Sequence, residues 1–432
     1  MKCFGFTLYF LFLIQLASGQ STFTANEAVD YARERSVNVA NSRLEQQRSG
    51  IEVERLQRRW LPNFSASTNI RYNPILQTTL LPAAISGGST GELIEVQFGT
   101  SFSSSIGLTV NQKIFDPSFR LERELIGLGK KKAARDEAYE YALVGIKVTA
   151  AYFQALLNQE IYQNSQSLLG GLAQLREDVR IRVENEQESL SLLHSINLQY
   201  RQQQHKIRVD SLNWLASLAN LKLEMNFPFE EELELTDSLV LMFEDLVIVT
   251  VDDNYDMQQY NFQLEESHNA SSRLQRSKLP TIEAEGYIGG QFFSQSPDLY
   301  NFKRWYGLSY IGLTANLPLY DGNDKRYGEQ IETLKREQVR NQMQAYRIEQ
   351  GNKAFRASLQ LESARAQALL AEEAIETAAQ NLELARFNYL NEVTGFQPVF
   401  EAQQALANSR EQLINAKASY IQAVLEARLL DL

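Results

Sequence analysis

The chain has 432 residues, 44% of them hydrophobic, and its 53 Asp and Glu residues outnumber its 42 Lys and Arg residues. This length and composition are sufficient for two or three ordinary domains with a buried core. The net charge of −11 and the lack of a basic run interleaved with aromatic residues argue against nucleic acid as a partner.

Residues 1–19 have the features of a secretory signal peptide. Lys2 precedes an apolar run over 4–16, and a small-x-small cleavage site follows at 17–19. A membrane anchor is the alternative, but it would need nearer to about 20 apolar residues. We expect cleavage after Gly19. The sole cysteine, Cys3, is then removed, so the exported chain has no disulfide and no cysteine-ligated metal.

Two pairs of segments have the two-residue period of strands with one apolar and one polar face. The first pair covers 64–72 and 96–110, and the second covers 282–288 and 311–319. In the second pair the alternation slips near Tyr310, which suggests a β-bulge. The sequence therefore predicts four amphipathic strands.

A helix is predicted to end just before each strand pair. The string Arg-Leu-Gln-Arg-x-x-Leu-Pro ends at Pro62 and again at Pro280. Proline disfavours helix in the residue before it and tolerates the start of a strand. The arginines one turn earlier (Arg55, Arg58, Arg273 and Arg276) could lie at a membrane surface, at the mouth of a lumen, or simply on solvated helix faces.

The repeated strings indicate an internal tandem repeat. Ile-Gly-Leu-Thr also occurs twice, from Ile106 and from Ile311. Each half is expected to contain a helix, two strands, a long helix and a returning helix. We therefore predict a first repeat over 20–225, a non-repeated segment over 226–256 and a second repeat over 257–432.

Very long helices are predicted over 118–184 and about 325–390. The first would be roughly 100 Å long at 1.5 Å per residue. Apolar residues have coiled-coil spacing in both halves, at Leu168, Leu172, Leu175 and Val179, and at Val399, Leu406, Leu413 and Tyr420. Asn-Glu pairs follow both long helices. We expect Asn185 and Asn391 to close them in the left-handed conformation, which Asn tolerates.

The residues of the exported chain do not suggest an enzyme. It contains three histidines, His194, His205 and His268, with no nucleophile motif, no Gly-rich phosphate loop and no metal-ligand spacing. We therefore expect neither catalysis nor a bound metal or cofactor.

Amphipathic strands in an exported protein are typical of an outer-membrane barrel, in which closure satisfies every backbone group. Four strands cannot close a barrel, since bacterial barrels need at least about eight. The chain would therefore assemble with copies of itself. The alternative is a non-transporting periplasmic or outer-membrane coiled-coil scaffold.

The order of motifs resembles that of the TolC-like outer-membrane efflux proteins. The resemblance rests on Glu27–Ala32 (EAVDYA), the two Leu-Pro pairs, the Asp that ends each second strand motif, and the segment 400–424. It implies an α+β membrane protein, in which a homotrimer forms one transmembrane β-barrel, four strands per chain, joined to a long α-helical coiled-coil barrel.

The resemblance also implies a function and partners. The protein would be a passive export duct in the outer membrane that extends into the periplasm. It would contact outer-membrane lipid, a periplasmic adaptor protein and an inner-membrane transporter, in a tripartite efflux pump or a type I secretion system.

Two groups of site residues follow from the resemblance. The helix tips that would dock the adaptor are Asn185, Glu186, Gln187, Asn391, Glu392 and Val393. The residues that match the family's pore gate are Tyr389, Thr394 and Glu401. Leu192 and Pro398 stand where the family often has acidic residues, and Thr394 stands where it often has a basic one. A solvated helix-face carboxylate is the alternative for Glu401.

Overall fold

The computed structural model describes residues 21–86, 91, 93–237, 254–391 and 393–430. The expected signal peptide, Glu392 and the part of the predicted non-repeated segment over 238–253 lie outside these residues. The chain forms two compact units. The first comprises the described residues up to 45 with 133–259 and 342–430, and the second comprises 46–132 and 260–341.

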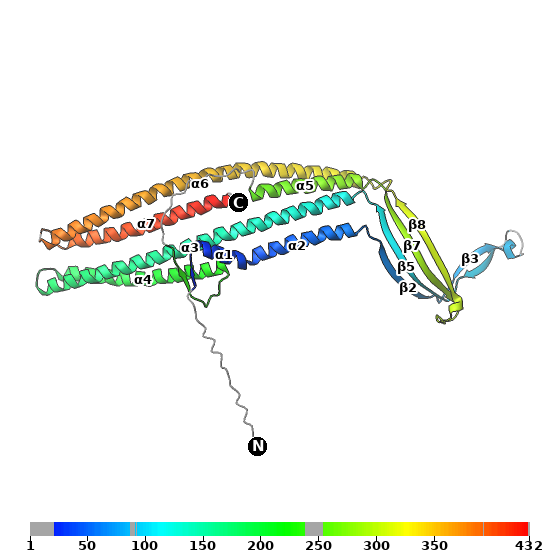
Figure 1. Cartoon of the computed structure of the whole chain (residues 1–432), viewed down its shortest axis with the longest axis horizontal. Helices are drawn as coiled ribbons and strands as arrows, with labels where there is room; N and C mark the ends of the chain where they lie inside the picture. The colour runs from blue at the N-terminus through cyan, green and yellow to red at the C-terminus, as the bar shows by residue number, and fades with distance from the viewer. Residues whose placement is uncertain (1–20, 87–90, 92, 238–253, 392, 431–432) are drawn as a thin grey trace, which may run out of the picture. The chain divides into compact units, whose positions relative to one another are not determined.

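A four-stranded antiparallel sheet dominates the second unit (Figure 1). Its strand order is β2-β5-β7-β8, and within the described residues β2 and β8 each pair with one neighbour. The strands are β2 (Asn63–Tyr72), β5 (Phe102–Phe115), β7 (Thr281–Ser294) and β8 (Trp305–Asn316). The sheet thus has two edges.

Helices lead into this sheet at the two predicted places. Helix α2 (Val37–Arg58) precedes β2, and α5 (Tyr255–Arg276) precedes β7. Both helices close with the same turn, because the amide of Leu61 donates to the carbonyl of Arg58 at 3.0 Å and that of Leu279 to Arg276 at 2.9 Å. The prediction from the Leu-Pro pairs is confirmed.

The predicted strand over 96–110 was wrong in its first half. Residues Leu93–Phe98 form a separate strand, β4, which pairs with β3 (Gln77–Pro82) in a hairpin. The break falls at Gly99, whose φ of 108° lies in a region that favours glycine. Phe98 is therefore not part of the four-stranded sheet.

The bulge expected near Tyr310 was also wrong. Strands β7 and β8 pair without a register shift, and Tyr310 lies opposite Tyr287. Leu308 and Tyr306 share the polar face with Tyr310, so the hydropathy alternation fails while the pairing stays regular. The register shift lies elsewhere, between Lys113 and Phe115, where β5 pairs with β7.

The long helices have nearly the predicted bounds. They are α3 (Phe119–Glu184), α4 (Leu190–Met225), α6 (Asp324–Leu390) and α7 (Gln397–Leu430). In the first unit Leu172, Leu175 and Val179 of α3 are buried in one cluster with residues of α4, α6 and α7. The coiled-coil spacing thus marks a packed seam. Of the helices in the described ranges, none combines the length and hydropathy needed to cross a membrane.

Two short strands and a capped helix complete the first unit. Strand β1 (Ser21–Phe23) pairs in parallel with β6 (Leu233–Leu235). Helix α1 (Ala25–Arg35) begins with a capping box, in which Thr24 and Glu27 each accept a backbone N–H of the other. The Asp237 carboxylate accepts the Ala25 amide at 2.8 Å. Strands of three residues show no periodicity in a sequence, so these were not predicted.

Candidate functional site

The turn between α3 and α4 is a Schellman motif. Glu186 has a φ of 60°, the amide of Gln187 donates to the carbonyl of Arg182 at 2.8 Å, and that of Glu186 donates to Val183 at 3.1 Å. Asn185 was predicted to take the left-handed conformation, but the residue after it does. Ser189 then caps α4 by accepting the amide of Leu192 at 3.2 Å.

The turn between α6 and α7 uses a related bond. The amide of Val393 donates to the carbonyl of Asn388, five residues earlier, at 2.9 Å, as that of Gln187 does to Arg182 in the first turn. Asn391 does not have a positive φ, so its predicted conformation was also wrong. Its side-chain amide instead donates to the carbonyl of Phe387 at 2.8 Å. Glu392, the remaining tip residue, lies outside the described part of the chain.

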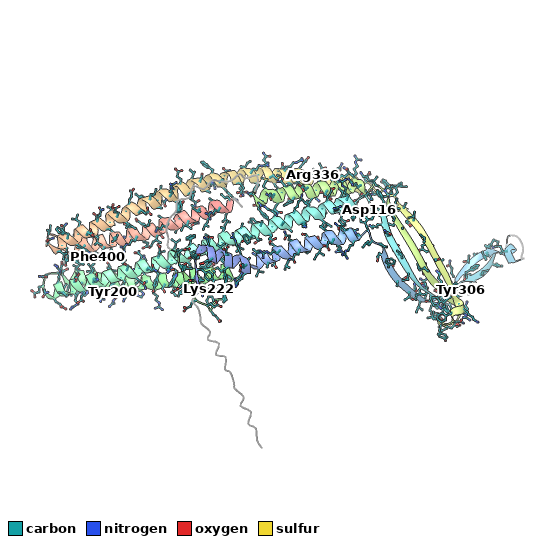
Figure 2. The ribbon with its side chains drawn as sticks, in the orientation of Figure 1. Asp116, Tyr200, Lys222, Tyr306, Arg336 and Phe400 are labelled. Atoms are coloured by element: carbon teal, nitrogen blue, oxygen red, sulfur yellow. The ribbon has the colours of Figure 1, made fainter. Side chains whose placement is uncertain are left out.

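Aromatic side chains form the core beneath the two turns. Phe396 and Phe400 are only 2% and 7% exposed. Tyr389 packs edge-on against Phe396 with ring centres 5.6 Å apart. Figure 2 labels Phe400 of α7, and also Tyr200 of α4, which is partly buried against the same cluster. Sequence reasoning had singled out Tyr389 of this group.

Tyr389, near the end of α6, contacts a residue near the end of α3. The Arg182 guanidinium of α3 lies 4.2 Å from the centre of its ring. Burial raises the pKa of the Tyr389 hydroxyl above its usual value. Within the described residues this hydroxyl and that of Thr394 are both buried and have no hydrogen-bond partner. Arg182 was not predicted, because no sequence pattern links it to Tyr389, about two hundred positions away.

The third gate candidate, Glu401, is more exposed than Tyr389 and Thr394. Its side chain is exposed in the first turns of α7 and accepts a hydrogen bond of 3.0 Å from Gln397. In the described chain no hydrogen bond joins Glu401 to Tyr389 or Thr394. The solvated position and a pore-facing position are both compatible with this geometry.

One face of the four-stranded sheet is apolar and exposed. Its most exposed large side chains are Phe64 (71%), Ile70 (68%), Ile288 (64%), Ile311 (93%) and Leu313 (75%). The strand pairing makes this face continuous from strand to strand. Phe64 lies opposite Val110, Leu108 opposite Ile288, and Ile311 opposite Gly286. Such a continuous patch marks a surface that contacts lipid or protein.

The other face is polar and closely packed around two glycines. Gly107 of β5 lies opposite Gly289 of β7, and the ring of Tyr287 lies against both. A Cβ atom at Gly107 would be 2.4 Å from the Tyr287 hydroxyl oxygen. At Gly289 it would also be 2.4 Å from the backbone oxygen of Ile106. Both glycines are required by close approach.

The histidines noted in the sequence lie on helix surfaces. His194 and His205 are exposed on α4 and His268 is exposed on α5. Within the ranges that the structure describes, no three His, Cys, Asp or Glu residues are grouped so that they could hold a metal ion.

The sequence matches no protein-family model and no curated protein. The fold, however, matches solved outer-membrane proteins. Over 94% of this chain, MtrE of Neisseria gonorrhoeae in its open state gives a TM-score of 0.75 at 15% identity with 88% of its own chain covered. VceC of Vibrio cholerae has a TM-score of 0.72 and 13% sequence identity, and 95% of its chain is covered. The CmeC channel of Campylobacter jejuni has a TM-score of 0.70 and 15% sequence identity, and 85% of its chain is covered. The chain therefore has the TolC-like fold of outer-membrane channels.

Proposed function

We propose that this chain is the outer-membrane channel of an export system. The exposed apolar face of the four-stranded sheet carries this proposal. Three copies would pool their four strands each into twelve, which is above the roughly eight that a closed barrel needs. Closure between β8 of one copy and β2 of the next would satisfy both sheet edges, and the apolar face would contact lipid.

The two halves of the chain would contribute equally to the duct. The proposed repeats over 20–225 and 257–432 are supported by the matching lengths of their helices. Helices α3 and α6 have 66 and 67 residues, and α4 and α7 have 36 and 34. The signal peptide over 1–19 would direct export, and the segment over 226–256 would lie outside the repeat.

The helix ends would form the gate and the docking surface. A buried hydroxyl without a partner costs free energy, so those of Tyr389 and Thr394 are expected to find partners in the assembled gate. The tip residues at 185–187 and 391–393 would contact a periplasmic adaptor. An inner-membrane transporter, of an efflux pump or a type I secretion system, would supply the cargo.

Cell fractionation separates this proposal from the scaffold alternative. A duct remains in the outer-membrane fraction after osmotic shock and stays trimeric in mild detergent. Release of the protein with the soluble periplasmic fraction, as a monomer, would favour the scaffold.

Disulfide trapping tests the closure itself. The only cysteine, Cys3, lies in the expected signal peptide, so introduced thiols have no competitor. We expect Ser67→Cys on β2 together with one of a series of cysteines along 306–314 of β8 to give a covalent trimer on oxidation. Ser67→Cys alone is the control and should give none. If no β8 position yields a trimer, the closed barrel is wrong.

A further inference from the structure

A basic cavity lies in the second unit, beside the joints between helices and strands. Its volume is about 620 Å³, and α3, α5 and α6 line it. Four arginines face it, Arg120, Arg276, Arg336 and Arg340. Figure 2 labels Arg336 on α6. Arg120 is in the first turn of α3 and Arg276 is the last residue of α5, so one end of the cavity is near the sheet.

The positive charge in the cavity is only partly neutralised. Two glutamates, Glu124 and Glu265, also line it, and Glu124 accepts a bond of 3.0 Å from Arg120. Within the described residues the guanidinium groups of Arg276 and Arg340 make no hydrogen bond or ion pair. These two arginines are therefore free to bind a ligand.

Arg336 is held in place and the floor is apolar. The Arg336 guanidinium donates to the carbonyl of Ser267 at 3.3 Å and to the hydroxyl of Thr333 at 3.0 Å, which fixes the side chain. Leu121 and Leu128 are buried beneath the cavity. Within the part of the chain that the structure describes, such a site offers a fixed guanidinium group and two unpaired ones above an apolar surface.

We infer that this cavity binds a phosphate-type oxyanion. The planar fork of arginine matches phosphate oxygens, and several arginines together bind such groups more tightly than one. The apolar floor suits an oxyanion that is attached to a carbon skeleton. The group could belong to a lipid headgroup or to a soluble phosphate-bearing solute. This inference does not depend on the proposed export function.

Two probes distinguish these sources with the full-length protein. Pyrophosphate, titrated calorimetrically at low salt into the purified protein in detergent, represents the soluble oxyanion. For the lipid, retention of phosphatidylglycerol by the protein is compared with retention of phosphatidylcholine. Each lipid is supplied in nanodiscs, and retention is measured by native mass spectrometry. Binding of pyrophosphate alone assigns a soluble ligand, and selective retention of phosphatidylglycerol alone assigns a lipid.

Charge variants test whether the cavity is responsible. We expect Arg276→Gln with Arg340→Gln to weaken binding of the active probe by roughly tenfold, since hydrogen bonds to charged groups are lost. Glu265→Gln should strengthen binding, because it removes a like charge. The matched control is Arg123→Gln with Arg326→Gln, two exposed arginines of α3 and α6 outside the cavity.

Three outcomes would overturn the inference. They are no binding of either probe, unchanged binding in the cavity variant, and an equal loss in the control variant. Circular dichroism confirms that each variant is folded.

Discussion

The guanidinium of Arg182 lies 4.2 Å from the ring centre of Tyr389 and so connects the end of α3 to the end of α6. A second contact of the same kind and length joins Arg176 to Tyr200, but it connects α3 to α4. The first contact therefore joins the helix pair α3–α4 to the helix pair α6–α7. The second contact lies within the pair α3–α4.

Loss of the first contact should favour the open duct. We expect Arg182→Gln to increase the single-channel conductance of the proposed trimer, because a cation–π contact of roughly 0.5–2 kcal/mol between α3 and α6 is removed. Arg176→Gln is the matched control and should leave the conductance unchanged. Equal conductance of Arg182→Gln and the wild type would show that this contact does not restrain the gate.

The charge at Glu401 gives a second prediction. If three copies converge on the pore, their carboxylates favour cations. Glu401→Gln should then lower cation selectivity and weaken block by trivalent cations in planar bilayers. Glu383→Gln, an exposed position on α6, is the control, and Glu392→Gln should affect adaptor docking more than conductance. Unchanged selectivity would return Glu401 to a solvated helix face.

The two faces of the sheet should respond oppositely to arginine. Leu108 is 54% exposed on the apolar face, and Leu108→Arg should cost about 2–4 kcal/mol if it lies near the bilayer midplane. Ser105→Arg, on the polar face, should be tolerated. Ser103 is a poorer control because it lies opposite Arg71. The amount of trimer in the outer-membrane fraction is the measurement, and the reverse result would invert the faces.

Alanine substitutions at Gly107 and Gly289 should differ in whether a second substitution at Tyr287 restores stability. Gly289→Ala would press on the Ile106 backbone oxygen and should reduce trimer stability by about 1–3 kcal/mol, as overpacking does. Gly107→Ala would meet only the Tyr287 side chain among its near contacts, so adding Tyr287→Ser should restore stability. The fraction of detergent-resistant trimer, measured as a function of temperature, reports the stability of each variant. Rescue of Gly289→Ala by Tyr287→Ser would contradict the backbone clash.

The long helices and their joints to the sheet could be predicted because they depend on local chemistry. The spacing of Leu172, Leu175 and Val179 and the proline at 62 act within a few residues of the chain. The break at Gly99 was missed because other glycines of this chain, such as Gly107 and Gly289, lie within continuous strands. Its φ of 108° is a property of the folded backbone.

The candidate site was predicted less completely. The tips were placed correctly between the long helices, but the left-handed residue was assigned to Asn185 because Asn tolerates that conformation better than Glu. The Schellman hydrogen bonds decide the position, and they place it at Glu186. The contact between Arg182 and Tyr389 depends on the packing of two helices, for which a single sequence contains no signal.

The pairing of β1 with β6 has a consequence for the order of folding. The hydrogen bond from Ala25 to Asp237 that follows it joins residues 212 positions apart. If the chain is exported from its N-terminus, as we propose, Ser21–Phe23 must stay unpaired until Leu233–Leu235 has crossed the membrane. Contacts of such long sequence separation form late. During the proposed export, Ser21–Phe23 would be exposed to proteases and chaperones, and would become protected only after more than half of the chain has been delivered.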